Sequence, residues 1–507
     1  MLPPTQQKNS RPLTRRNFLR NGSLGGLSLA FGGWSIAGCA TKTTAGNRTA
    51  RALAEIKGSS VPRKVELIQE IHEREAFSPS GIMYSMIRMD TDGLRPFVAS
   101  DFTGKIWKQA EVGQLKLDGP WDYLQGENSI TASGLYLTAQ TYRYEVTGSA
   151  KAREQARRAF HSLELIYQMG VRDGKPGWMG KPYGFRPSVQ TSGDQYLDAT
   201  WGLWTYHRIA TTAERRRIEE MIINFADYWR SVNYVLSYFG KTWDQKSEPD
   251  SYNAIHAMIN ACAYSFSKSP EHLQQFEWWM ERASWPTRTR IDGLRAKVAQ
   301  QIKDGGRPSV VRYAATFRLA RNLLERGEFL CWETVVHSRF VAVAAEVISE
   351  TGVPFAKERL AEILPRWWAE TKYGMPDDFH GYYWFAVNLS NDTWRPLPRT
   401  ELLPKDRWMF GDPFISYISQ IREHDSLART ILTSTIAASH CPAERDRMRD
   451  AALQIFRAVE ADHFRWLLDL DGQQLLPEIS YYGQCLSSEM PGSFLAAYWK
   501  GKRDKLW

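Results

Sequence analysis

Acidic side chains stand where several apolar helices are expected to begin. Glu127 precedes an apolar stretch that starts near Ser129, and Asp194 opens the next one in the turn Ser192-Gly193-Asp194-Gln195. Asp198 follows Asp194 by four residues, so both side chains would lie on one face of a helix. Cleavage of a glycosidic bond requires two carboxyl groups of this kind, one protonated and one ionised. We therefore take Asp194, Glu127 and Asp198 as the candidate catalytic residues.

Each of these acids also has a structural interpretation. Aspartate, serine and glutamate are common at helix starts, where they cap free backbone N–H groups and interact favourably with the helix dipole. The catalytic interpretation depends on convergence, because it requires carboxylates from separate helices to meet at one end of the fold. An apolar cleft rich in tryptophan would then drive the pKa values of neighbouring carboxyl groups apart.

Further polar and aromatic side chains are expected to bind substrate. Residues 377–384 combine two acids, a histidine and four aromatic residues. They are expected either to form a loop that binds substrate or to hold a loop in place by packing against the fold. The candidate substrate-binding residues are Asp122, Tyr123, Asp250, His256, His337, Asp378, His380, Tyr382, Trp384, Tyr481 and Tyr482.

A second chemistry stays open beside the paired carboxylates. A metal-free uronate lyase uses Asn, His or Arg to neutralise the substrate carboxylate, and Tyr or His to remove the C5 proton. Suitable residues are Asn253, His256, His337, Arg339 and Tyr481 or Tyr482. A lone histidine in an apolar helix is also a common core residue. No H-E-x-x-H motif and no C-x-x-C spacing occurs in the sequence, so we expect no metal and no cofactor.

A helical pattern recurs along the chain. An apolar stretch rich in small residues, such as 132–139, is followed by a short turn and then by a striped helix, such as 152–166. An apolar helix is buried on all sides, whereas a striped helix covers the outside. The five turns lie at 147–149, 211–214, 267–271, 351–354 and 439–444. The sequence therefore predicts an all-α fold, an (α/α) toroid or barrel of about five to six helical hairpins.

The two ends of the chain and its two longest connections complete this prediction. A sixth pair would join the apolar segment 494–498 with the striped segment 61–74. The stretches 284–330 and 371–412, rich in Pro, Gly and Trp, are expected to be long functional loops. Almost no strand alternation is visible.

Two hairpins resemble those of the six-hairpin glycosidase-like (α/α toroid) superfamily. The resemblance rests on Trp121-Asp122-Tyr123, Gly126-Glu127-Asn128-Ser129, Gly134–Leu137 and Tyr142–Gly148 in the first hairpin, and on Ser192–Asp198 with Gly202–Tyr206 in the second. The superfamily includes unsaturated glucuronyl hydrolases, other glycoside hydrolases and toroidal polysaccharide lyases. The resemblance implies an active site at the mouth of the ring, and in the unsaturated glucuronyl hydrolases a mouth-facing aspartate protonates the substrate and positions water. Asp194 is the candidate for that role.

The first 39 residues resemble a twin-arginine lipoprotein signal. Arg15-Arg16 is followed by Phe18-Leu19, by a Gly-rich run too short to span a membrane, and by the lipobox-like Ile36-Ala37-Gly38-Cys39. An ordinary secretory signal with an incidental cysteine is the alternative. We expect export by the twin-arginine route and lipidation of Cys39, which would anchor the protein at a membrane on the periplasmic or cell-surface side. Residues 40–60 would be a flexible tether and 61–507 the toroid domain.

Composition favours a sugar-binding protein over a nucleic-acid-binding one. The formal charge of +9 includes five basic residues of the signal, so the remaining chain carries +4 and has no Lys/Arg block. The 20 Trp, 22 Tyr and 22 Phe residues suit a cleft in which sugars stack on aromatic rings. We therefore expect an oligo- or polysaccharide partner, with a non-catalytic glycan-binding lipoprotein as a third alternative.

Four cysteines follow Cys39 in the sequence. Cys262, Cys331, Cys441 and Cys485 allow three disulfide pairings. Cys262 and Cys331 lie in apolar runs and are expected to be small buried side chains.

Overall fold

The computed structural model describes residues 48–90, 93–102, 117–238, 241–246, 252–282, 300, 311–312, 316–318, 326, 328–332, 334–371, 384–388, 393–396, 425–460, 465–467 and 484–507 of the 507-residue chain. The chain divides into two compact units, Met1–Ala45 and Gly46–Trp507. The following sections concern the second unit.

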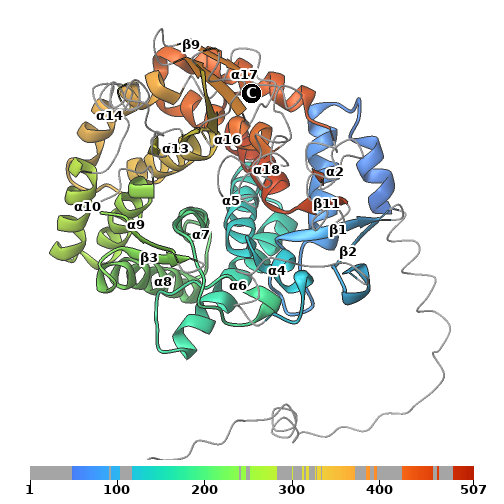
Figure 1. Cartoon of the computed structure of the whole chain (residues 1–507), viewed down its shortest axis with the longest axis horizontal. Helices are drawn as coiled ribbons and strands as arrows, with labels where there is room; N and C mark the ends of the chain where they lie inside the picture. Colours follow the sequence, from blue (N-terminus) through green and yellow to red (C-terminus); the bar gives the residue numbers. More distant parts are fainter. Residues whose placement is uncertain are drawn as a thin grey trace, which may run out of the picture. The chain divides into compact units, whose positions relative to one another are not determined.

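The described part of this unit is mostly helical, which confirms the predicted all-α class (Figure 1). Its main helices are α2 (Val61–Glu75), α4 (Pro120–Gly126), α5 (Ser129–Thr147), α6 (Ala150–Arg172), α7 (Gly193–His207), α8 (Thr212–Ser231), α9 (Tyr252–Ser267), α10 (Pro270–Arg282), α13 (Thr334–Glu350), α14 (Ala356–Thr371), α16 (Asp425–His440), α17 (Arg445–Ala458) and α18 (Glu489–Arg503). Short 3-10 turns include η1 (Ala99–Phe102), η2 (Tyr183–Phe185) and η6 (Pro442–Glu444).

The described part of the chain contains five helical hairpins at the positions that the sequence predicts: α5–α6, α7–α8, α9–α10, α13–α14 and α16–α17. Local signals explain where their helices begin and end. Gly148 ends α5 in the left-handed conformation, with φ of 65°. Ser149 caps α6 by accepting from the backbone of Ala152, and Thr211 with Glu214 forms a reciprocal capping box at the start of α8.

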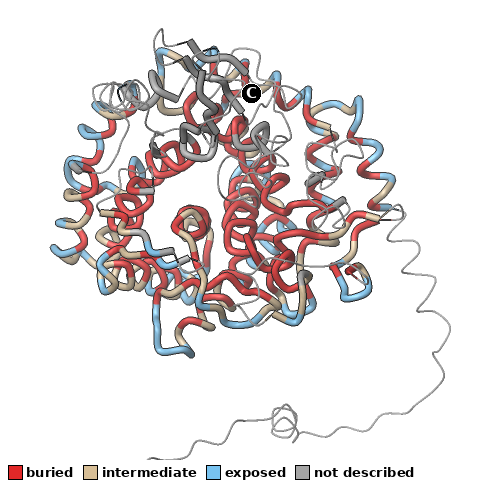
Figure 2. The backbone as a smooth tube through the Cα atoms, in the orientation of Figure 1, coloured by how far each residue is buried: buried red, intermediate tan, exposed pale blue. Residues whose placement is uncertain are grey.

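The first helix of each hairpin is more deeply buried than the second (Figure 2). Every residue from Ser129 to Tyr142 in α5 is buried. In α6 the deepest burial follows the predicted stripe, which comprises Ala152, Ala156, Ala159, Phe160, Leu163 and Ile166. The amphipathic helices thus cover the apolar ones, as their sequence patterns predict.

Contacts link the buried helices in sequence. Helix α5 packs against α7, α7 against α9, α9 against α13, α13 against α16, and α16 against α18. Helix α18 packs in turn against α5, beside which it runs in Figure 1, and against α2. The two ends of the unit therefore meet.

Strands are more numerous than the sequence indicates. Within the described ranges the strands form three antiparallel sheets, with orders β10-β11-β1-β2, β3-β4 and β5-β6-β7-β8-β9. Their strands are β1 (Met86–Asp90), β2 (Gly93–Arg95), β3 (Val235–Tyr238), β4 (Lys241–Asp244), β5 (Val311–Arg312), β6 (Thr316–Arg318), β7 (Glu328–Trp332), β8 (Trp384–Asn388), β9 (Thr393–Pro396), β10 (Arg465–Leu467) and β11 (Gln484–Ser487). Strands of two to five residues are too short for a period of two to be visible.

The sheets also change the expected connections. Strands β5 to β9 draw mostly on the stretches 284–330 and 371–412, so these stretches are not entirely loops. Strand β1 pairs with β11 in the register Met86↔Ser487, across almost the whole unit. Pairing over such separations leaves no local signal in a single sequence.

The packed unit begins earlier than predicted. Residues 48–55 are helical, and Ala52, Leu53 and Ile56 are buried in the core. The expected flexible tether 40–60 is therefore wrong for its second half, because this segment has apolar side chains to bury. No helix within the described ranges is both long and apolar enough to cross a membrane.

Candidate functional site

The starts of three buried helices meet at one end of the packed unit. Gln195, in the first turn of α7, donates from Nε2 to the backbone carbonyl of Glu127 at 2.9 Å, just before α5. Asn128, at the start of α5, donates from Nδ2 to Glu489 Oε2 of α18 at 3.5 Å. The backbone of Glu127 thus lies next to the first turn of α7, which contains Asp194, and Glu489 adds a carboxylate at the start of α18.

Asp194 and Asp198 lie one turn apart on α7 but in different surroundings. Asp198 is fully buried, and its Oδ1 accepts from Arg339 Nη1 of α13 at 2.7 Å. Asp194 is only partly buried. Asp194 Oδ1 and Asp198 Oδ2 are both enclosed without a hydrogen-bond partner among the described residues. Such orphaned oxygens mark a place where water or a ligand group can bind.

The buried position changes the acidity of Asp198. Burial raises the pKa of its carboxyl group, which the Arg339 guanidinium opposes and the negative charges of Glu489 and Asp194 reinforce, giving a pKa of about 7. Asp198 can therefore hold a proton near neutral pH. A carboxyl group with this property is suited to acid–base chemistry.

Glu127 is held firmly by the loop that joins α6 and α7. Its Oε1 accepts from Lys181 Nζ at 2.5 Å, and its Oε2 accepts from the Tyr183 hydroxyl. Tyr123 of α4 stacks on Tyr183 with ring centroids 5.4 Å apart. These contacts fix the carboxylate in place and give it a cationic neighbour.

Asp122 fastens the same loop at a second point. Its Oδ2 accepts from Arg186 Nη2 at 2.6 Å, and a Cβ on Gly184 would lie within 2.9 Å of its carboxylate. Gly184 has φ of 57°, a left-handed conformation that glycine adopts without strain. Two predicted substrate-binding residues, Asp122 and Tyr123, therefore adjoin Glu127 and position the loop beside it.

His256 lies in an aromatic part of the core. Its ring is 4.9 Å from the rings of Trp229, Tyr234 and Trp279, and Nε2 contacts Gln245. Burial, reinforced by the charge of Lys246, lowers its pKa to about 3. The imidazole is thus neutral and only 1% exposed, in agreement with the interpretation of His256 as a core residue.

Other predicted residues lie beyond what the structure describes. Helix α13 contains His337 and strand β8 contains Trp384, but only their backbones are described. Asp250, Asp378, His380, Tyr382, Tyr481, Tyr482 and the lipidation residue Cys39 are outside the described residues. Cys262 and Cys441 are free thiols, and Cys262 is buried as expected.

Sequence reasoning missed several partners of the candidate acids: Lys181, Tyr183, Arg186 and Glu489. A signal for the first three exists, because the basic and aromatic run 181–186 lies a short distance before the turn that contains Asp194, with residues 187–191 between them. Glu489 follows the same rule as Glu127, an acid at the start of an apolar helix, but the sequence pattern did not show that α18 begins there.

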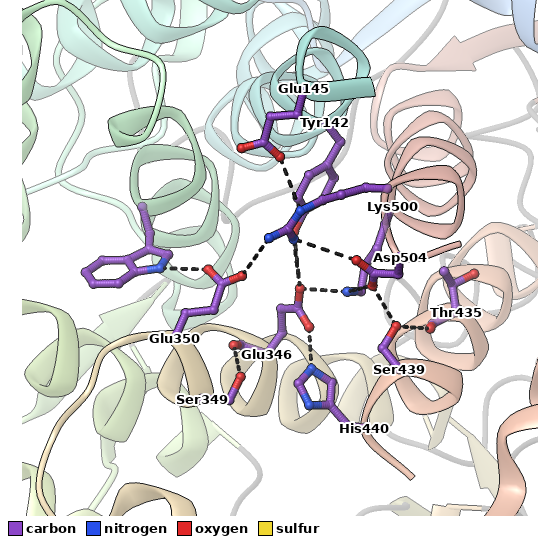
Figure 3. Close-up of polar contacts among 12 residues, drawn as sticks. Tyr142, Glu145, Glu346, Ser349, Glu350, Thr435, Ser439, His440, Lys500 and Asp504 are labelled. Carbon is purple, nitrogen blue, oxygen red and sulfur yellow. Dashed lines mark hydrogen bonds and ion pairs between the residues drawn. The ribbon is translucent and has the colours of Figure 1, made fainter. Parts of the chain in front are cut away.

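The opposite ends of the buried helices carry a dense ionic network (Figure 3). Glu346 of α13 binds Lys500 Nζ at 2.7 Å and contacts His440 of α16. Burial would raise the pKa of Glu346, but Lys500 and His440 outweigh burial and hold it well below its usual range. Arg503 joins Glu145 and Glu350 at 3.3 and 3.2 Å. Cations at helix C-termini also complement the helix dipoles.

Neither a metal centre nor a relative identifies the site. Within the described residues, no group of three or more His, Cys, Asp or Glu side chains could hold a metal ion. The sequence matches no known family model and no curated protein.

Proposed function

We propose that this protein is an exported carbohydrate-active enzyme, a glycoside hydrolase with paired carboxyl groups at the N-terminal ends of its buried helices. The observation that carries the proposal is the contrast between Asp194 and Asp198. One is partly exposed with an unpartnered oxygen, and the other is buried, ion-paired and of raised pKa. Environments that separate neighbouring carboxyl groups in this way are a mark of acid–base sites.

The fold we propose for it is the (α/α) toroid of the six-hairpin glycosidase-like superfamily. Support comes from the unbroken series of contacts from α5 through α7, α9, α13, α16 and α18, and from α18 to α5. The pairing of α2 with α18 would supply the sixth hairpin. In such a ring, the starts of α5, α7 and α18 would form the mouth.

Each carboxyl group has a distinct role in this proposal. Asp194 is the candidate for contact with the substrate, because it is the partly exposed member of the α7 pair, whereas Asp198 is fully buried. Asp194 is the candidate to pass a proton to the glycosidic oxygen as the bond to the anomeric carbon breaks, with Asp198, the carboxyl group of raised pKa, one turn further along the same helix. Glu127, fixed by Lys181 and Tyr183, is the candidate for the second carboxylate, which activates water or attacks that carbon.

The proposed location follows from the N-terminal resemblance. Arg15-Arg16 and Cys39 would direct export by the twin-arginine route and lipid anchoring. The enzyme would then meet oligo- or polysaccharides on the periplasmic or outer side of a membrane. Several acyl chains are needed for firm attachment, since one chain anchors only marginally.

Product analysis separates this proposal from its alternatives. Purified protein is incubated with a panel of polyuronides and neutral glycans, and reducing ends and ultraviolet absorption are measured. New reducing ends without absorption by a C4–C5 double bond are the expected result. Absorption by unsaturated products would identify a uronate lyase instead. Binding without turnover on every glycan would identify a glycan-binding lipoprotein.

A further inference from the structure

The partner of Asp198 comes from a helix far away in the sequence. Arg339 lies in the second turn of α13, which packs against α7, and its side chain is only 1% exposed. It donates from Nη1 to Asp198 Oδ1 at 2.7 Å. The ion pair therefore connects two buried helices directly beneath Asp194.

This pair is incompletely satisfied. Arg339 Nε and Asp198 Oδ2 are both buried and lack a hydrogen-bond partner among the described residues. Removing charges from water is repaid only when the remaining polar atoms are also hydrogen-bonded. If the only role of the pair were stability, we would expect these two atoms to have hydrogen-bond partners.

A second buried ion pair in the chain has these additional hydrogen bonds. Lys500 and Glu346 are also buried, 2.7 Å apart, at the opposite ends of the same set of helices. Lys500 Nζ reaches Asp504 as well at 2.5 Å, and the Glu346 carboxylate also contacts His440 and Tyr142 (Figure 3). The contrast indicates that the Arg339–Asp198 pair does more than stabilise the fold.

The charges around Asp198 explain what it can do. Arg339 from α13 favours its ionised form, whereas Glu489 from α18 and Asp194 from α7 disfavour it. Helix α5 adds no charge at the closest approach, because there Gly134 meets the backbone of Asp198. Arg339 is thus the single cation among these groups that offsets two neighbouring carboxylates.

We propose that Arg339 is a positioning residue of the site, a role that rests on the proposed function. Its ion pair holds the Asp198 carboxyl group in one orientation and sets the pH at which that group releases its proton, one helical turn below the substrate-facing Asp194. Arg339 itself does not touch the substrate.

Removing the guanidinium has a predictable consequence. In the Arg339→Met variant, the two carboxylate neighbours remain without a compensating cation, so Asp198 binds its proton more tightly. The fold tolerates this change because a protonated carboxyl group avoids the cost of an unpaired buried charge. We expect the proton affinity of Asp198 to rise at least tenfold, whereas Arg339→Lys changes it by less than threefold.

Infrared spectroscopy measures this directly. The stretching band of the protonated carboxyl group is followed between pH 5 and 9. The band is assigned to Asp198 by its absence from the double variant Asp198→Asn with Arg339→Met, which removes both charges. We expect the wild-type band to disappear near neutral pH and the Arg339→Met band at higher pH. The control Lys500→Met, at the other buried pair, should leave the midpoint of the Asp198 band unchanged, and any additional band in that variant belongs to Glu346, which loses its cation there. A wild-type protein without this band, or an equal midpoint in Arg339→Met, would overturn the proposal.

Enzyme kinetics provide the second readout. On a glycan that the wild-type protein hydrolyses, Arg339→Met should move the alkaline limb of the pH profile of kcat/KM to higher pH. Arg339→Lys should return the limb to its wild-type position. An equal loss at every pH, with no movement of the limb, would reduce Arg339 to a structural residue. If no glycan is hydrolysed, the proposed function fails, and the infrared titration still decides the role of Arg339.

Discussion

At the residue scale, two buried carboxyl groups have different acidities because their surroundings differ. Burial and neighbouring acids raise the pKa of Asp198 to about 7, whereas Lys500 and His440 overcome the burial of Glu346 and hold its pKa low. Both residues lie in buried helices, so helix position alone does not decide which acid keeps a proton. The number and sign of nearby charges decide it.

The buried His256 makes the stability of the folded protein depend on pH in the opposite direction from the buried Asp198. The pKa of His256 is lowered to about 3, below its unfolded value, so its contribution to stability is present above about pH 6.5 and is lost as the pH falls. One such group adds a slope of about 1.4 kcal/mol per pH unit in this range.

The variant His256→Gln should remove that slope. We expect urea unfolding between pH 4 and 6.5 to show a free energy less dependent on pH than that of the wild-type protein. His161→Gln is the control, because His161 is 57% exposed on the surface. An unchanged slope in His256→Gln would mean that the imidazole is charged or accessible in the folded protein.

The helix starts at which the candidate acids stand were predictable from the sequence, but the contacts that those acids make were not. Asp194 and Glu127 stand at helix starts, and a helix start has a local pattern of caps and apolar residues. Their surroundings depend on residues distant in sequence: Arg339 lies 141 positions from Asp198, and Lys181 lies 54 from Glu127. No periodicity within one sequence records such distances.

At the element scale, close packing of α5 on α7 positions the candidate site. A Cβ on Gly134 of α5 would lie 2.2 Å from the backbone oxygen of Asp198, and one on Gly202 of α7 would lie 2.6 Å from the oxygen of Gly134. The helices can approach this closely only because both positions are glycine. Their separation therefore determines where Asp198 sits relative to α13.

The variant Gly134→Ala tests this packing. We expect it to lower the free energy of unfolding by at least about 2 kcal/mol, since the methyl group meets backbone and the helices must separate. Chemical denaturation measures the change. Gly148→Asn is the control, because Gly148 has open space around it and asparagine tolerates its left-handed conformation. Equal stability of Gly134→Ala and the wild-type protein would contradict the close approach.

Helices were easier to predict than strands for a physical reason. The stripe in α6 and the capping box of α8 are local, and each specifies its helix without information from elsewhere. Strand β11 has only four residues and pairs with β1 and β10, while β7 has five and pairs with β6 and β8. Such strands depend on partners that the sequence does not identify.

At the scale of the whole molecule, the two ends of the buried helices differ in kind. The C-terminal ends are joined by ion pairs between Glu346, Lys500, Arg503 and their neighbours. At the N-terminal ends, oxygens of Asp194 and Asp198 remain unpartnered among the described residues. We infer that the first end stabilises the fold and that the second end binds ligand.

The proposed location of the molecule is tested at the other end of the chain. Cys39→Ala should release the protein from membranes into the soluble fraction, because no acyl chain can be attached to alanine. Replacing Arg15 and Arg16 by lysine should leave uncleaved precursor in the cytoplasm. Immunoblots of cell fractions measure both. Normal export of the double-lysine variant would exclude the twin-arginine route.

The most direct measurement of the central claim is the activity of Asp194→Asn on a glycan that the wild-type protein cleaves. Asparagine keeps the size of the side chain and suits a helix start, so stability should change by less than ~1 kcal/mol. Turnover should fall at least ~10²-fold, the low end for loss of a general acid or base. Glu271→Gln, an exposed acid in the first turn of α10, is the matched control and should stay within a few-fold of the wild-type protein. Full activity in Asp194→Asn would contradict the account.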